Sequence, residues 1–220
     1  HTGRGQLCRI ETTDAQGSLL TRSTFQYSPR GQLVARHDDG LGADDVTWFG
    51  YDLMGRIGAI VYPSGHFARY GYHRGKVQRL TVQMPDGTIA SVVSNIEHQP
   101  FGGIKGWTYG NGLKRLQGYD LDGRLNALSV TAGSTVRQSL TYAWTANDQI
   151  EAVTNGVDAT QSHRYEYDEL GRLVGDFIGG ATVGNRDGFD AVGNRTSRGS
   201  TTPGTPPSST YAISPVSNRM

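Results

Sequence analysis

Residues 165–174 read YEYDELGRLV, which is a Tyr-Asp pair, two further residues, and then Gly-Arg-Leu. Asp at the first position and Gly at the fourth are typical of a type I turn, because the Asp side chain accepts a nearby backbone N–H and Gly tolerates the left-handed conformation. A type I turn followed by such a Gly is a common β-hairpin loop with a G1 bulge. The stretch therefore predicts a corner at which one antiparallel strand turns into the next.

Two close copies of this phrase occur earlier in the chain, GYDLMGRI from Gly50 and GYDLDGRL from Gly118. In the predicted register the Asp lies opposite the Arg and the Tyr lies opposite the aliphatic residue, and each such pair contributes roughly 0.2–1 kcal/mol. The predicted turn residues are Tyr51, Asp52, Gly55, Arg56, Tyr119, Asp120, Gly123, Arg124, Tyr167, Asp168, Gly171 and Arg172, and their aliphatic partners are Ile57, Leu125 and Leu173.

Looser copies keep the scheme with substitutions. They begin at Tyr27, Tyr72, Trp144 and Phe189, and EHQPFGGI (97–104) is a worn copy. In these copies we expect Asp148 to occupy the Gly place, Tyr72 to lie opposite Val77 across a two-residue turn, and Phe189 to lack an aliphatic partner. A second turn type, Pro or Gly before a polar residue and Gly, alternates with the first at 62–65, 84–87 and 109–112.

The spacing of these turns indicates a serial architecture. Tyr62 and Tyr72 recur after 47 residues at Tyr109 and Tyr119, and Tyr119 recurs after 48 at Tyr167. A lone hairpin is marginally stable, so successive hairpins are expected to pair edge to edge. The predicted fold is all-β, with serial antiparallel β-hairpins forming one long twisted, curled sheet. Period-2 alternation predicts strands over 140–144 and 163–167, and we find no helix.

The sequence divides into four expected segments. Residues 1–24 form a degenerate repeat or edge segment, 25–198 form the hairpin array, 199–210 form a Ser/Thr/Pro-rich loop, and 211–220 begin a further repeat. The first residue is His1 rather than Met, so we expect the chain to be processed or cut from a longer one.

Composition excludes several classes of function. The net charge is +1, which argues against the clustered basic face that nucleic-acid binding requires. The longest apolar stretch, 57–62, is far shorter than the ~20 residues that a spanning helix needs, so no membrane insertion is expected. The chain has one cysteine, Cys8, and therefore no internal disulfide.

The sequence contains no recognised catalytic or metal-binding pattern. The histidines at 1, 37, 66, 73, 98 and 163 lack metal-ligand spacing, and no G-x-S-x-G elbow occurs. The acidic residues Asp38, Asp39, Asp44 and Asp45 are interpreted as a solvated loop between hairpins rather than a calcium site. We expect no catalytic residue, metal or cofactor, and no enzymatic activity. Trp48 and Trp107 are candidates either for packing on the sheet or for stacking on sugars, whereas Trp144 occupies the Tyr place of a repeat.

The recurring Tyr-Asp-x-x-Gly-Arg-Leu phrases, together with QPFGGIKGWTYGNGL (99–113), resemble the Rhs/YD-repeat family over about residues 25–220. That family includes bacterial Rhs proteins, Tc-toxin shell components and teneurin-like YD shells. The resemblance implies a wall segment of an exported, secreted or cell-surface protein whose hollow β-shell encloses or presents a C-terminal toxin or other polypeptide cargo. The family's self-cleaving core is not found here.

The resemblance also implies partners. These are the remaining repeats and the toxin cargo of the parent polypeptide, with no nucleic acid. The alternative function is a carbohydrate-binding cell-surface module, which would bind cell-surface glycans through Trp48 or Trp107.

Overall fold

The computed structural model describes residues 5–40, 43–100, 102–180, 184–200 and 205–212, and the side chains at 43 and 44 are not among them. The chain divides into two units, His1–Gly112 and Leu113–Met220. Apart from one turn of 3-10 helix at Ala159–Gln161, the regular structure of both described units consists of β-strands. The predicted all-β fold class is therefore confirmed.

The first unit contains β1 (Arg9–Thr13), β2 (Leu19–Tyr27), β3 (Leu33–Gly40), β4 (Ala43–Tyr51), β5 (Ile57–Val61), β6 (Phe67–His73), β7 (Lys76–Gln83), β8 (Ile89–His98) and β9 (Ile104–Tyr109). The second unit contains β10 (Lys114–Tyr119), β11 (Leu125–Ala132), β12 (Thr135–Trp144), β13 (Ile150–Asn155), β14 (His163–Tyr167), β15 (Leu173–Ile178), β16 (Asn185–Phe189), β17 (Arg195–Ser200) and β18 (Ser209–Thr210). The strands predicted over 140–144 and 163–167 are the end of β12 and the whole of β14.

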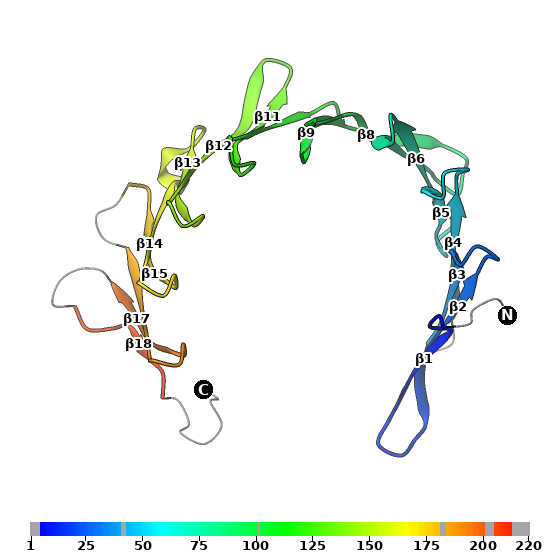
Figure 1. The fold of residues 1–220 in the computed structure, drawn as a ribbon, viewed down its shortest axis with the longest axis horizontal. Helices are drawn as coiled ribbons and strands as arrows, with labels where there is room; N and C mark the ends of the chain where they lie inside the picture. Colours follow the sequence, from blue (N-terminus) through cyan, green and yellow to red (C-terminus); the bar gives the residue numbers. More distant parts are fainter. Residues whose placement is uncertain (1–4, 41–42, 101, 181–183, 201–204, 213–220) are drawn as a thin grey trace. The chain divides into compact units, whose positions relative to one another are not determined.

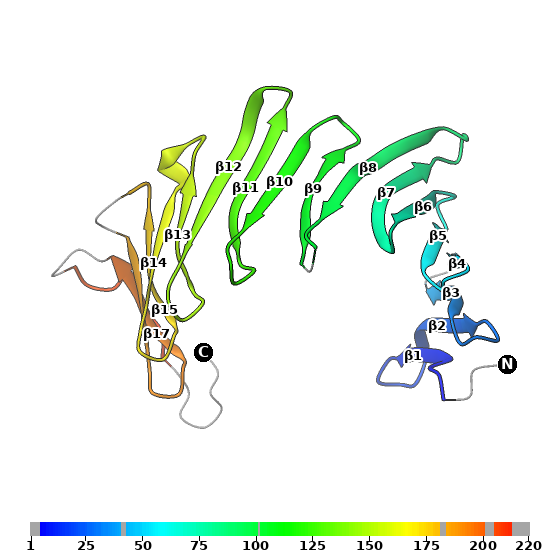
Figure 2. The ribbon, with the colours of Figure 1, turned by 45° about the horizontal axis from the view of Figure 1, so that its top comes forward.

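Within each unit, every strand pairs antiparallel with the next strand along the chain. Figures 1 and 2 show the strands of each unit side by side in chain order. This is the serial hairpin arrangement that the repeated turns predict. The paired strands of each unit form a single layer, which is visibly curved (Figure 1).

A β-bulge follows each Tyr-Asp turn and each of its looser copies. In the hairpin of β4 and β5, Gly50 pairs with Ala59 and Tyr51 pairs with Ile57, which leaves Gly58 without a partner. The equivalent unpaired residues of the other hairpins are Val34, Gln78, Lys105, Asn126, Glu151, Val174 and Thr196. A bulge bends its strand and increases the local right-handed twist, so its regular return supplies a physical cause for the curvature of each unit.

Few side chains are buried, because no second layer of described residues covers the paired strands of either unit. Among the described residues, the buried apolar side chains are Ala35, Ala68, Leu128, Val130 and Phe177. The accessible surface is 14792 Å², against roughly 9,900 Å² expected for a compact monomer of this mass. Strand pairing and contacts between neighbouring side chains, rather than a deep core, therefore hold each unit together.

The interpretation of the acidic residues as a loop is wrong. Asp38 and Asp39 lie in β3 and pair with Asp45 and Asp44 of β4. Opposed like charges destabilise a sheet, and here the Ser23 hydroxyl donates to the Asp38 carboxylate at 2.5 Å while Arg36 approaches it at 2.8 Å. These local partners offset the repulsion between the opposed carboxylates.

The four predicted segments are only partly described. Residues 1–24 contain β1, which pairs with β2, and 199–210 contain the short strand β18. Residues 201–204 and 213–220 lie outside the described residues, so the further repeat expected from residue 211 stays a prediction.

Candidate functional site: the Tyr-Asp turns

The three close copies of the turn have one backbone geometry. In the first copy the Asp52 N–H donates to the Arg56 carbonyl at 2.9 Å and the Gly55 N–H donates to the Asp52 carbonyl at 3.0 Å. Gly55 has φ 78°, in the left-handed region that a residue with a Cβ rarely adopts. The copies at 119–125 and 167–173 repeat both hydrogen bonds, with φ 81° at Gly123 and 75° at Gly171. The predicted type I turn with a G1 bulge is thus what the chain forms.

The aspartate carboxylate holds each turn together from inside. One oxygen of Asp52 accepts the backbone N–H of Met54 at 2.9 Å and that of Arg56 at 3.0 Å. The other oxygen binds the Arg56 guanidinium at 2.8 Å and 2.6 Å. Equivalent contacts join Asp120 to Arg124 and Asp168 to Arg172. The structure therefore brings together the Asp and Arg that the sequence places opposite each other.

These contacts lower the pKa of the turn aspartates. The Arg56 guanidinium is the main cause at Asp52, and the Arg172 backbone N–H is the main cause at Asp168. At Asp120 partial desolvation acts to raise the pKa, but the hydrogen bonds from Arg124 outweigh it and the net shift is downward. All three carboxylates are therefore held in the charged form that the turn uses.

The aromatic residue of most of the turns contacts the preceding hairpin, which the sequence analysis did not foresee. The Tyr51 hydroxyl donates to the Leu33 carbonyl at 2.8 Å, and the Tyr167 hydroxyl donates to the Ile150 carbonyl at 2.8 Å. The acceptor in each case is the residue in the aliphatic place of the previous turn. The same bond is made by Tyr27 to Leu7, by Tyr72 to Ile57 and by Trp144 Nε1 to Leu125, and His98 Nε2 lies 2.8 Å from the Val77 carbonyl.

One signal in the sequence could have revealed this bond. The Tyr place holds Tyr, Trp or His in nearly every copy, and these aromatic side chains carry a polar tip. If this side chain only packed against an aliphatic residue, Phe would serve at the Tyr place as well as Tyr. Phe189 is the exception, and it carries no group that could donate to the preceding hairpin.

The arginine of each turn contacts the following hairpin. The Arg56 guanidinium lies 4.1 Å from the ring centroid of Tyr72, and that of Arg172 lies 5.0 Å from the ring of Phe189. Arg172 Nη1 also donates to the Asp190 carbonyl at 2.8 Å. Where Gln replaces Arg, its side-chain amide donates to the Gly carbonyl of the next turn; these pairs are Gln6–Gly31, Gln32–Gly55 and Gln149–Gly171.

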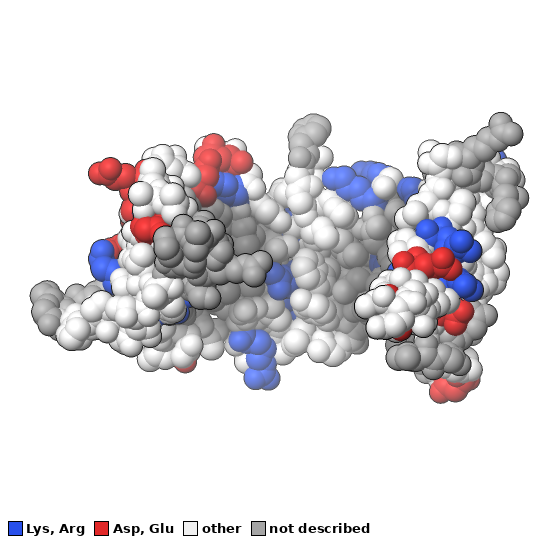
Figure 3. Space-filling model, turned by 90° about the horizontal axis from the view of Figure 1, so that it is seen from below, with Lys and Arg blue, Asp and Glu red and all other residues white. Residues whose placement is uncertain are grey.

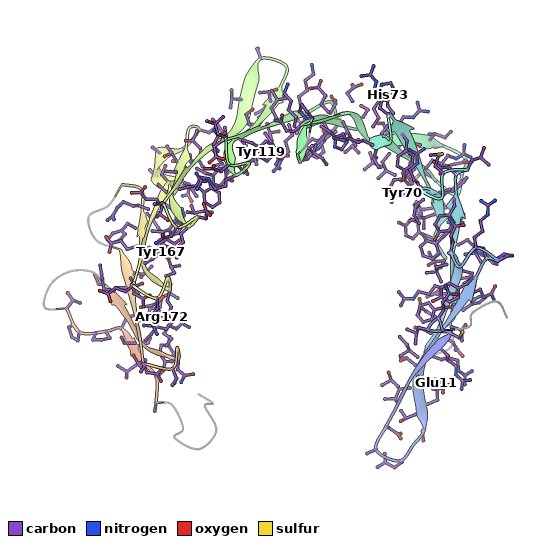
Figure 4. The ribbon with its side chains drawn as sticks, in the orientation of Figure 1. Glu11, Tyr70, His73, Tyr119, Tyr167 and Arg172 are labelled. Carbon is purple, nitrogen blue, oxygen red and sulfur yellow. The ribbon has the colours of Figure 1, made fainter. Side chains whose placement is uncertain are left out.

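The turns of each unit are thus linked both backward, through the aromatic tip, and forward, through the Arg or Gln. We call this row of linked Tyr-Asp turns and looser copies the turn rim. Figure 4 shows Tyr119 and Tyr167 on one face of the second unit, and Tyr70 and His73 on opposite faces of the first, with Tyr70 on its concave side.

The looser copies keep the predicted geometry. Asp148 has φ 61° in the Gly place, Tyr72 pairs with Val77, and Phe189 pairs with Arg195 instead of an aliphatic residue. In the worn copy His98 pairs with Ile104, while the position of Phe101 lies outside the described residues. The second turn type also forms hairpins, as Gly65 N–H donates to the Tyr62 carbonyl at 2.9 Å.

The two tryptophans proposed for sugar stacking are in different environments. Trp48 in β4 is 48% exposed, and its ring meets that of His37 edge-on at 6.2 Å. Trp107 in β9 is half-buried and packs edge-on against Tyr109 at 5.6 Å. No ring contact joins the two among the described residues. Only Trp48 therefore offers a broad open surface, whereas Trp144 is in the Tyr place, as predicted.

Several charged side chains outside the turns are paired. At the end of the first unit that carries β1 to β3, acidic and basic groups lie next to one another (Figure 3, right), and Arg22 approaches Glu11 at 2.8 Å and Asp39 at 4.0 Å. Within the described part of the chain, no three His, Cys, Asp or Glu side chains gather as metal ligands would. None of the helical residues described forms a segment long and apolar enough to cross a bilayer.

Comparison with known proteins shows which solved structures share this arrangement of strands and turns. No protein-family model matches the sequence, and no curated protein matches it. Among solved structures, the chain is similar to the Tc holotoxin pore of Photorhabdus luminescens, with a TM-score of 0.71 and 14% identity over 85% of this chain and 12% of that one. The chain has the fold of the matched part of this Tc-toxin structure.

Two further solved structures share this fold. TcdB2–TccC3 with Cdc42, and TcdB2–TccC3 without its hypervariable C-terminal region, each have a TM-score of 0.67 and 14% identity over 96% of this chain. The chain spans between 12% and 16% of the length of these three proteins. The resemblance to YD-repeat proteins that the sequence motifs indicate is therefore confirmed at the level of the fold.

Proposed function

We propose that the chain is a structural wall segment of an exported Rhs/YD-repeat protein that encloses or presents a polypeptide cargo. The observation that carries the proposal is the turn rim, in which successive turns are linked through side chains on a fold shared with Tc-toxin chains. Such links suit a wall, because each hairpin is fixed to the one before it and the one after it.

The wall would act by confinement rather than by catalysis. Its ladders satisfy the backbone polar groups of neighbouring strands, so it presents little loose backbone to a protease. The carboxylates of the turns, which are the most regular titratable groups, are committed to holding the turns. We therefore assign the chain no enzymatic activity.

The proposed partners are further repeats of the same polypeptide and a cargo segment. Support comes from the similar TcdB2–TccC3 structure that lacks a hypervariable C-terminal region, because a variable segment attached to a constant YD-repeat fold is what a cargo would be. Export follows from the same proposal, since a toxin shell acts outside the cell that makes it.

Limited proteolysis of the longer polypeptide that this proposal requires would test it. We expect its C-terminal segment to resist protease while the wall is intact, and to be cleaved when Asp52→Ala, Asp120→Ala and Asp168→Ala open the turns. Arg137→Ala, which removes an exposed side chain near the start of β12, is the control and should leave protection unchanged. A C-terminal segment cleaved equally fast in all forms would refute enclosure.

Carbohydrate binding is the second candidate, on the single observation that Trp48 is 48% exposed. The similarity to toxin chains lends it no support. If it is correct, Trp48→Ala abolishes binding to a glycan array without unfolding the chain, whereas Trp107→Ala, at a half-buried position, leaves binding largely intact. An array with no signal above background would remove this candidate.

A further inference from the structure

The convex face of the first unit carries a depression of about 440 Å³ that lies beside the turn rim and is not lined by the Asp and Arg of the Tyr-Asp turns. Its floor is formed by Gly58, Ala59 and Gly71, and two arginines, Arg69 and Arg79, stand at its sides. The register places Arg69 opposite Ala59 on one neighbour and opposite Thr81 on the other, while Arg79 lies opposite Gly71. Because Tyr70 lies on the concave side (Figure 4), its alternating neighbours Arg69 and Gly71 are on the other face. The two arginines, here called the arginine pair, thus share one face.

The described contacts of the arginine pair are with an aromatic ring, a side-chain amide and a glycine rather than with a carboxylate. Arg69 stacks on Phe67, with Cζ 4.5 Å from the ring centroid, and its Nη2 makes one long hydrogen bond of 3.4 Å to Gln83. The Arg79 side chain lies across Gly71, because a Cβ built on that glycine would be 2.5 Å from Cγ and 2.6 Å from Nε of Arg79. Among the described residues, neither arginine has an ion-pair partner.

The surrounding sequence adds positive charge and no negative charge. No Asp or Glu occurs from Leu53 to Pro85, a segment that also contains Arg56, Arg74 and Lys76. Arg56 is paired with Asp52, and Lys76 Nζ donates to the Gln99 carbonyl at 2.9 Å. Several other arginines of the described chain meet carboxylates, as Arg164 and Arg186 meet Glu166 at 2.8 Å and 2.6 Å. The arginine pair is therefore an uncompensated pair of cations beside an open depression.

We propose that the arginine pair and the depression bind an oxyanionic group of a ligand, independently of the wall function. Guanidinium edges present parallel N–H donors that match the oxygens of phosphate, sulfate or carboxylate, and stacking on Phe67 leaves the edges of Arg69 free. The small floor residues leave room for the anion between the two side chains. Two cations match a doubly charged tetrahedral anion better than a singly charged carboxylate, so phosphate and sulfate bind more tightly than acetate.

Titration of the full chain with inorganic phosphate, sulfate and acetate at constant ionic strength tests the proposal. The readout is the side-chain Nε–H resonances of arginine in ¹⁵N-labelled protein. We expect saturable shifts of the Arg69 and Arg79 resonances, and Arg79→Gln weakens affinity by at least about tenfold because one charge-assisted hydrogen-bonding group is lost. The anion that saturates at the lowest concentration identifies the ligand chemistry.

Two further variants separate specific binding from charge and from folding. Arg137→Gln removes one positive charge at an exposed place in the second unit and leaves the affinity unchanged. Gly71→Ala keeps every charge but displaces the Arg79 side chain, and so weakens binding while the backbone spectrum of the rest of the chain stays the same. Linear, unsaturable shifts with all three anions, or equal losses in Arg79→Gln and Arg137→Gln, overturn the proposal.

Discussion

The place held by Tyr in the repeated turn has two requirements at the scale of the single residue. Its ring packs opposite an aliphatic residue of its own hairpin, and its tip donates a hydrogen bond to the hairpin before. Trp144 and His98 satisfy both requirements with different ring atoms, at 2.9 Å and 2.8 Å from their carbonyls. The substitutions tolerated at this place are therefore explained by where the polar atom lies on the ring.

Removing only the hydroxyl isolates the second requirement. Tyr51→Phe and Tyr167→Phe are each expected to destabilise the chain by about 0.5–1.5 kcal/mol, because one partly buried hydrogen bond to a carbonyl is lost. Urea unfolding measures the change. Tyr70→Phe is the matched control, since its hydroxyl bonds to no described residue, and it should have little effect. Equal losses in all three variants would mean that the hydrogen bond to the preceding hairpin contributes nothing.

The turn aspartates make stability depend on pH in one direction. Because their pKa values are lowered in the folded chain, their stabilisation is present above the ordinary aspartate pKa and is lost as the pH falls through the lowered values. We expect the urea midpoint to be steady near neutral pH and to fall below about pH 4.

Asp52→Asn, Asp120→Asn and Asp168→Asn, combined in one chain, provide the control for this pH dependence. The amide oxygen still accepts the turn N–H groups but no longer pairs with a guanidinium. This variant should be less stable than the native chain at pH 7 and equal to it near pH 2. A constant difference across the whole range would contradict the assignment.

At the scale of the element, the unit that repeats is a turn followed by a bulge. The turn was predictable because its chemistry is local, with Asp, Gly and Arg at fixed positions in seven residues. The G1 bulge at the turn glycine was predicted with the turn, whereas the second bulge, in the strand that follows, was not, since its unpaired residues, such as Gly58, Gln78 and Glu151, share no side-chain property. This second bulge arises from a one-residue offset between the two paired strands, and the sequence alone does not determine that offset.

Replacing a turn glycine tests the element directly. Gly123 has φ 81° and no atom within 4 Å of a built Cβ, so Gly123→Ala should cost about 1–2 kcal/mol through backbone conformation alone. Faster amide hydrogen exchange in β10 and β11 reports the loss.

Gly50→Ala is the comparison, because Gly50 lies in a strand without positive φ and a Cβ there would make an ordinary 3.5 Å contact. It should leave exchange unchanged or slow it. Unaltered exchange in Gly123→Ala would show that the left-handed position is not required.

Contacts between hairpins mark the limit of what the sequence predicted. The Asp–Arg pair joins residues four apart and was foreseen, whereas the aromatic-to-carbonyl bonds join residues between 15 and 21 apart and were missed. Their variable spacing hides them from a search for fixed periods. The same holds for the acidic strands β3 and β4, whose stabilising partner Ser23 belongs to a different strand.

At the scale of the whole molecule, every strand in a unit depends on its immediate neighbours, since there is no second layer. Repeat arrays of this kind are stabilised by unit and nearest-neighbour terms, so damage stays local. Asp168→Ala should raise hydrogen exchange in β14 and β15 and leave β2 to β5 unaffected, as measured by mass spectrometry of peptic fragments. Uniform acceleration throughout the chain would indicate one cooperative unit instead.

Phe189 has a consequence for how the second unit comes apart. Its hairpin lacks the backward hydrogen bond, and among the described residues β15 and β16 share two paired positions, Gly175 with Arg186 and Asp176 with Asn185. Under heat or mechanical force, the pairing of β15 with β16 should therefore be the first to separate, and the contacts of Arg172 with Phe189 and Asp190 should be the last there to break. Phe189→Tyr would supply the missing hydroxyl and should shift the first site of separation to another strand pair.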